Sequence, residues 1–208
     1  MITRRAIRAA AFAAFGLSLM CAPALADSKA RTEQVVLAGG CFWGMEAVFE
    51  RIKGVSNVVA GFAGGGKDTA HYEDVSTGTT GHAESVQITY DPAKVSFDRL
   101  LDVYFTVAHD PTELNRQGPD SGSQYRSEIF YTTPAQHVAA EMAIKRLTEA
   151  HAFPAPIVTL VAPLRGFFAA EAYHQHFYDK NPDYPYIVVN DRPKVERLRE
   201  KYPSLVKG

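Results

Sequence analysis

Cys41 is the residue of this chain whose type and surroundings most clearly suggest chemistry. The 208-residue sequence has two cysteines, and we expect Cys21 to be lost with an N-terminal export signal. Gly39 and Gly40 precede Cys41, and a helical pattern begins at Phe42. The first turn of a helix has unpaired N–H groups and a partial positive charge, so the sequence predicts a Cys41 pKa below the usual value of about 8.5. A lone cysteine is either a small buried hydrophobe or a reactive thiol, and this setting favours the thiol.

Two large aromatic residues follow the cysteine directly. Phe42 fits the apolar stripe of the expected helix, so core packing and a site role both stay open for it. Trp43, the single tryptophan of the chain, falls outside that stripe. We therefore expect Trp43 to cover a pocket.

Residues 40–44 read GCFWG, which resembles the active-site signature of the type A peptide methionine sulfoxide reductases. Further blocks similar to that family are YEDV at 72–75, TGHAE at 80–84, QGPD at 117–120, QYRS at 124–127 and AEAYHQ at 170–175. The resemblance covers about residues 34–190, nearly all of the chain that follows the expected signal.

The resemblance implies that the thiolate of Cys41 attacks the sulfur of methionine sulfoxide, free or in a peptide, and becomes a sulfenic acid. It also implies specificity for the S epimer and a role in the repair of oxidised proteins. Glu84 matches the acid of the family, which must keep its proton in an apolar setting to act. Without the resemblance, Glu84 would read as an exposed carboxylate on a strand.

The remaining site residues are also implied by the resemblance. Tyr72 and Tyr125 match tyrosines that hydrogen-bond the sulfoxide oxygen, and Asp120 matches a residue that contacts the backbone side of the substrate. Phe42 and Trp43 match the apolar pocket for the substrate methyl group. His174 is expected to be a supporting residue, and no cofactor is expected.

No cysteine follows Cys41, whereas many members of the family carry one or two near the C-terminus. We therefore expect a one-cysteine cycle, in which an external thiol reduces the sulfenic acid. The reductant would be a thioredoxin-like protein or a small thiol.

The same residues are compatible with other functions. Cys41 also suits a cysteine hydrolase with a distant histidine as base, although the residues before it do not fit a papain-like signature. An exported protein that only binds oxidised methionine is a further alternative. The seven histidines have no metal-binding spacing with a second cysteine, so no metal site is expected.

The N-terminus has the pattern of a secretory signal. Arg4, Arg5 and Arg8 precede an apolar stretch that ends in Ala24-Leu25-Ala26. We expect residues 1–26 to be cleaved, 27–33 to be flexible, and 34–208 to form one catalytic domain in a soluble protein that is exported to the periplasm. An uncleaved anchor, a lipoprotein and a twin-arginine route are the alternatives.

Composition excludes some classes of partner. The chain has 22 basic and 23 acidic residues, and loss of the signal removes three of the basic ones. The resulting acidic excess does not suit nucleic acid or an anionic membrane surface. No later apolar run suits stable membrane insertion.

The elements that must position these residues alternate along the chain. We expect strands at 34–38, 55–62, 82–90, 128–131 and 157–164, with helices at 42–53, 97–108, 134–150, 169–180 and 193–202. Loops rich in glycine or polar residues cover 64–81 and 109–125. The predicted fold is α+β, a single domain with a mixed sheet flanked by helices in a two-layer sandwich or roll.

Overall fold

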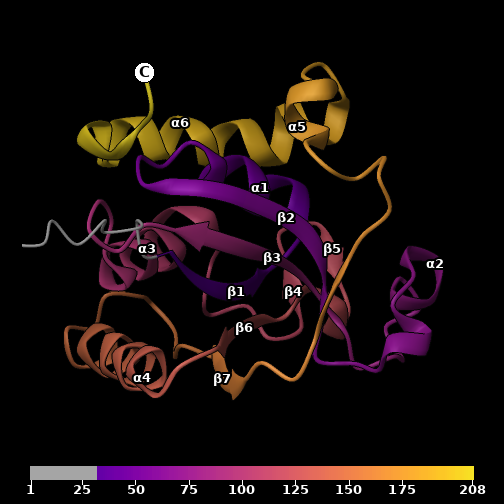
Figure 1. The fold of residues 1–208 in the computed structure, drawn as a ribbon, viewed down its shortest axis with the longest axis horizontal. Coiled ribbons are helices and arrows are strands. Elements are labelled where there is room, and N and C mark those ends of the chain that lie inside the picture. Colours follow the sequence, from indigo (N-terminus) through magenta and orange to yellow (C-terminus); the bar gives the residue numbers. More distant parts are fainter. Residues whose placement is uncertain (1–31) are drawn as a thin grey trace, which may run out of the picture.

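A computed structural model describes residues 32–208 of the chain (Figure 1). The predicted signal at 1–26 and most of the predicted flexible stretch at 27–33 lie outside the described residues. The first strand includes Glu33. Regular structure therefore starts at the last residue of the stretch predicted to be flexible.

The main sheet has six strands in the order β7-β6-β1-β3-β2-β8. Its strands are β1 (Glu33–Gly39), β2 (Val55–Ala63), β3 (Ala83–Tyr90), β6 (Ser127–Tyr131), β7 (Leu160–Pro163) and β8 (Phe167–Ala169). All neighbours are antiparallel except β6 and β7, which are parallel. A separate ribbon pairs β4 (Arg116–Gln117) with β5 (Asp120–Ser121). The predicted mixed sheet is confirmed.

The helices are α1 (Phe42–Glu50), α2 (Tyr72–Val75), α3 (Phe97–Val103), α4 (Pro134–Glu149), α5 (Phe177–Lys180) and α6 (Arg192–Lys201). The chain widens into π-helical turns at Tyr104–Ala108 and Ile187–Asp191. Ser96 and Thr133 begin α3 and α4 by accepting hydrogen bonds from main-chain N–H groups of the first turn. None of the helices in residues 32–208 has the length and apolar character needed to span a bilayer.

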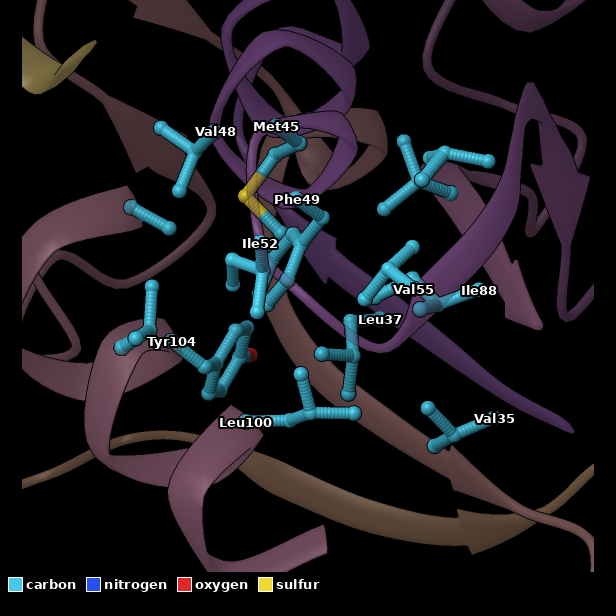
Figure 2. Close-up of a cluster of buried hydrophobic side chains, with 14 of the residues drawn as sticks. Val35, Leu37, Met45, Val48, Phe49, Ile52, Val55, Ile88, Leu100 and Tyr104 are labelled. Carbon is cyan, nitrogen blue, oxygen red and sulfur yellow. The ribbon is translucent and has the colours of Figure 1, made fainter. Parts of the chain in front are cut away.

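The core lies on one face of the sheet. Side chains of a strand point alternately to its two faces, and Val35 and Leu37 of β1 join the large cluster while Val36 and Ala38 join a small one on the other face. Figure 2 shows residues of α1 gathered with Leu37 and with Tyr104 in the large cluster. In Figure 1, α6 lies along α1, so α1 is enclosed between the sheet and a second helix. This burial fixes the helix that starts directly after Cys41.

The predicted helix at 169–180 is wrong over most of its length. Residues 167–169 form β8 at the edge of the sheet, and only Phe177–Lys180 is helical. The Gln175 amide side chain accepts a hydrogen bond from the N–H of Ala60 at 3.0 Å and donates to its carbonyl oxygen at 2.9 Å. His176 then takes a left-handed conformation with φ of 55°. These contacts with β2 outweigh the local helical preference. The strand predicted at 157–164 is also shorter, since β7 begins at Leu160.

Replacing Phe49 by Ala tests whether α1 is held by burial in the core. Phe49 is fully buried, and removing a buried aromatic ring leaves a cavity that costs about 3–5 kcal/mol. We expect urea denaturation to show a loss of that size in the free energy of unfolding. Met142→Ala is the control, because Met142 is 65% exposed and should change stability by less than about 0.5 kcal/mol. Equal effects of the two substitutions would contradict this account of the core.

Candidate active site

Cys41 lies at the junction between β1 and α1. Gly40 has φ of 84°, and a Cβ atom at this position would overlap the side chain of Gln117. Only glycine fits such a turn comfortably. Cys41 follows as the residue that precedes the first helical residue, Phe42, and it is 8% exposed. The sequence Gly-Cys thus places a thiol at the start of a buried helix.

Glu84 meets this junction from the neighbouring strand. Its Oε2 atom accepts a hydrogen bond from the main-chain N–H of Phe42 at 3.1 Å, and its side chain is buried. The N–H groups of a first helical turn have no partners within the helix. Glu84 therefore satisfies an N–H group adjacent to Cys41 and is tied to the turn that carries the thiol.

A pocket of about 190 Å³ opens at this point. The structure brings all seven site residues predicted from the sequence to its wall, together with two further tyrosines: Cys41, Phe42, Trp43, Tyr72, Glu84, Asp120, Tyr125, Tyr184 and Tyr186. A larger hollow of about 770 Å³ lies along α4, between residues such as Asp102 and Met142. That hollow has no thiol in its lining, so the chemistry belongs to the smaller pocket.

Burial raises the pKa of Glu84 to about 8. The hydrogen bond from the Phe42 N–H opposes this shift, and the charges of Asp120 and Asp191 add to it. Removal from water penalises the charged carboxylate. Glu84 is thus mostly protonated at neutral pH and can donate a proton within the pocket.

The predicted low pKa of Cys41 is wrong. Burial raises the pKa of the thiol well above its ordinary value, and the negative charges of Glu84 and Asp191 add to that effect. The N–H of Trp43 and the charge of Lys194 act in the opposite direction but are weaker. The helix N-terminus does favour the thiolate, as the sequence suggested, yet desolvation outweighs it.

Trp43 forms one wall of the pocket, as predicted. Its ring stacks on Phe177 with centroids 3.8 Å apart and an angle of 9° between the planes, and the rings of Tyr184 and Tyr186 meet it edge-on. Phe42 is 1% exposed, belongs to the main core and also lines the pocket. Phe42 therefore packs in the core and borders the pocket at the same time.

His174 supports this wall from behind. Its Nδ1 atom accepts a hydrogen bond from the indole N–H of Trp43 at 3.1 Å, which assigns the ring hydrogen to Nε2. Its ring lies 4.3 Å from that of Tyr72 and 4.9 Å from that of Phe42, measured between centroids. His174 thus contacts three lining residues, although the predicted helix around it does not form.

The tyrosines of the pocket supply hydroxyl groups. Burial raises the pKa of Tyr72, Tyr125 and Tyr186, so these phenols stay neutral and can donate hydrogen bonds. The Tyr186 hydroxyl donates to Oδ2 of Asp120. This contact holds the Asp120 carboxylate at the rim.

Four residues near the thiol were missed by the sequence analysis: Tyr184, Tyr186, Asp191 and Lys194. Asp191 is fully buried, and its Oδ1 accepts from Lys194 Nζ at 3.1 Å. A Cβ atom at Gly44 would overlap Asp191 Oδ1, which gives the last glycine of GCFWG a steric reason. The aromatic run Tyr-Pro-Tyr at 184–186 was the available signal for the two tyrosines.

Known proteins match most of the described chain. A family profile described as peptide methionine sulfoxide reductase matches residues 33–205. The peptide methionine sulfoxide reductase MsrA 2 of Mesorhizobium japonicum is 55% identical over 181 residues, which is 86% of this chain and 93% of the relative. The protein of the same name from Synechocystis is 51% identical over 85% of this chain and 83% of its own length.

Two solved structures have a similar fold. Reduced Mxr1 from Saccharomyces cerevisiae superposes with a TM-score of 0.68 at 33% identity, covering 75% of this chain and 89% of that one. Methionine sulfoxide reductase A of Corynebacterium diphtheriae gives a TM-score of 0.64 at 37% identity, covering 73% and 76%. The α+β fold of this chain is shared with these structures.

The protonated state of Glu84 predicts a specific dependence of stability on pH. As the pH rises from about 4.5 to about 8, Glu84 ionises in the unfolded chain while the folded chain keeps its proton. Stability contributed by this residue is therefore present at low pH and lost across that window. We expect Glu84→Gln to gain free energy of unfolding relative to the parent as the pH rises from 5 to 8, measured by urea titration.

Glu200→Gln serves as the matched control for this experiment, because Glu200 is exposed on α6. Its difference from the parent should stay constant over the same pH range. A Glu84→Gln difference that is equally constant would show that Glu84 is ionised in the folded protein.

Proposed function

The chain belongs to the peptide methionine sulfoxide reductase family, and on that premise we propose that it reduces the S epimer of methionine sulfoxide through a sulfenic acid at Cys41. The substrate is free methionine sulfoxide or an oxidised methionine in a protein, and the outcome is repair. One observation carries this proposal: a lone thiol and a protonated carboxyl share a single pocket, joined through the Phe42 N–H.

The proposed reaction transfers one oxygen atom. Sγ of Cys41 attacks the sulfoxide sulfur and forms a transient S–S bond. The oxygen then moves to Sγ as the S–O bond of the substrate and the S–S bond both break, which releases methionine and leaves a sulfenic acid on Cys41. The substrate sulfur gains two electrons and the cysteine sulfur loses two. The thiol brings one proton and the sulfenic acid keeps one, so this half of the cycle takes no net proton from water.

Glu84 acts as the proton donor in this scheme. The sulfoxide oxygen is a poor leaving group until it is protonated, and a carboxyl with a pKa of about 8 carries the proton at neutral pH. The Cys41 proton released when the thiolate forms can restore it. The hydroxyls of Tyr72 and Tyr125 line the same pocket and are assigned to hydrogen-bond the oxygen.

In this proposal, specificity for the S epimer arises because one side of the pocket is apolar and the other is polar. Phe42 and Trp43 present aromatic surface, whereas the tyrosine hydroxyls and Glu84 present polar groups. The methyl group of the S epimer faces the rings, with its oxygen toward the donors. The opposite epimer would place its oxygen against apolar surface without a partner, which is costly. Asp120, held by Tyr186, is assigned to the backbone side of the substrate.

Recycling of the sulfenic acid needs an external reductant, because no cysteine follows Cys41. Two thiols consume the sulfenic acid, yielding a disulfide, water and the free Cys41 thiol. A thioredoxin-like protein or a small thiol would supply them. If residues 1–26 direct export, the reductant acts in the periplasm.

Trapping the intermediate tests the cysteine chemistry directly. After one turnover with L-methionine (S)-sulfoxide and no reductant, we expect dimedone to label Cys41, detected by mass spectrometry, with one methionine formed per chain. The (R)-sulfoxide should give neither product. Cys41→Ser should form no methionine, whereas a protein that only binds the sulfoxide would keep its affinity in both forms. Labelling at another site, or an intramolecular disulfide, would contradict the proposed cycle.

Replacing Glu84 by Gln tests the proton donor. We expect kcat to fall by about 100- to 10,000-fold, the range for loss of a general acid, with little change in the dissociation constant for substrate. The parent kcat/KM should decline as the pH rises past about 8, because Glu84 then loses its proton. The residual activity of the variant should lack this decline. Full activity in Glu84→Gln would remove Glu84 from the mechanism.

A further inference from the structure

A second cluster of titratable side chains lies on α1, beyond the pocket. Glu46 and Glu50 are four residues apart and therefore occupy one face of the helix. His176, which immediately precedes α5, meets the same face. Each of the three offers one ligand atom, and these atoms lie within 4.8 Å of one another. The spacing is short enough for one ion to contact all three.

Glu46 is the unusual member of the cluster. It is 1% exposed, and its Oε2 atom accepts the main-chain N–H of His176 at 2.7 Å. Its other oxygen, Oε1, is buried and has no hydrogen-bond partner. A buried carboxylate oxygen without a partner is costly, and a bound cation would satisfy it.

His176 lies on the solvent-exposed side of the cluster. Its Nδ1 lies 2.6 Å from Oε1 of Glu50, and its side chain is 52% exposed. A hollow of about 210 Å³ is lined in part by Glu50, His176 and Asn57. An ion can therefore reach the cluster from this side, whereas Glu46 closes the inner end.

The nearby cations are engaged with other groups. Arg51 pairs with Asp179 at 2.5 Å. Lys180 and Lys207 each donate to a main-chain carbonyl oxygen, at 2.8 Å and 2.6 Å. Each of these three cations therefore has a partner other than the Glu46 and Glu50 carboxyl groups.

We propose that Glu46, Glu50 and His176 bind one divalent transition-metal ion, with Zn²⁺ as the best match. One imidazole and two carboxylates form a mixed nitrogen and oxygen set, which suits Zn²⁺ better than Mg²⁺ or Ca²⁺. Three protein ligands leave a fourth position for water. The histidine spacing in the sequence did not indicate this site, because its ligands come from segments more than 120 residues apart.

The ion would link two parts of the pocket wall. Glu46 and Glu50 belong to the helix that begins with Phe42 and Trp43, and Phe177, which follows His176, stacks on Trp43. A ligand that binds only the folded state stabilises it by mass action. Zn²⁺ should therefore raise the thermal unfolding midpoint of the protein.

Calorimetric titration of Zn²⁺ into the Cys41→Ser protein tests the proposal, since that substitution removes the thiol as a competing ligand. We expect one ion per chain. Loss of a residue that only supports a metal ligand lowers metal affinity about 10- to 100-fold, so loss of a ligand itself, in Glu50→Gln or in His176→Asn, should lower the affinity at least about tenfold. Asn suits the left-handed backbone at 176. The Zn²⁺-dependent rise in the unfolding midpoint should disappear in both variants.

His137→Asn is the matched control, because His137 lies 3.8 Å from Glu141 in an exposed pair on α4. It should bind Zn²⁺ like its Cys41→Ser parent. The absence of saturable binding, unchanged affinity in both cluster variants, or an equal loss in the control would overturn the proposal. Zinc-edge X-ray absorption of the Cys41→Ser protein needs no cluster variant. One nitrogen ligand among oxygens is expected, and a shell without nitrogen would refute the site.

Discussion

The hydrogen bond from the main-chain N–H of Phe42 to Glu84 is the contact on which the site depends. It joins the turn after β1 to strand β3, and so holds the Glu84 carboxyl beside the Cys41 thiol. Because β1 and β3 are adjacent antiparallel strands, the sheet itself keeps this distance constant. The backbone itself aligns these two groups. Large movements of α1 are opposed by the core beneath it, where Phe49 and Met45 are fully buried.

Burial has opposite consequences for the Cys41 thiol and the Glu84 carboxyl. In the proposed reaction the carboxyl must hold a proton, and desolvation favours that state. The thiol must lose a proton to attack, and desolvation opposes this. The positive charge of Lys194 and the N–H of Trp43 partly offset the cost for the thiolate. In the proposed reaction the two protons are exchanged within the pocket. The buried thiol therefore stays protonated at neutral pH, which limits its oxidation because the thiolate is the reactive form.

Local patterns predicted the elements that build this site, and long-range contacts decided the rest. The strand before Cys41 and the helix after it could be predicted because each has a short sequence period, and the glycine pair between them is a local turn signal. The helix predicted at 169–180 failed because Gln175 binds the main chain of Ala60, a partner 115 residues away. The pKa of Cys41 was misjudged for a similar reason, since the helix end is visible in the sequence but Asp191 and the depth of burial are not. Glu84 was identified only through the family resemblance, since a strand carboxylate carries no local sign of burial.

Trp43, which stacks on Phe177, makes the intrinsic fluorescence of the protein a probe of the pocket. Trp43 is the single tryptophan of the chain, and its indole N–H is bonded to His174 while its ring lines the pocket. Indole emission responds to the polarity and hydrogen bonding around the ring. All tryptophan fluorescence therefore originates at the wall that a substrate would touch, and pocket occupancy can be followed in the unlabelled protein without a chromogenic substrate or a coupled reaction.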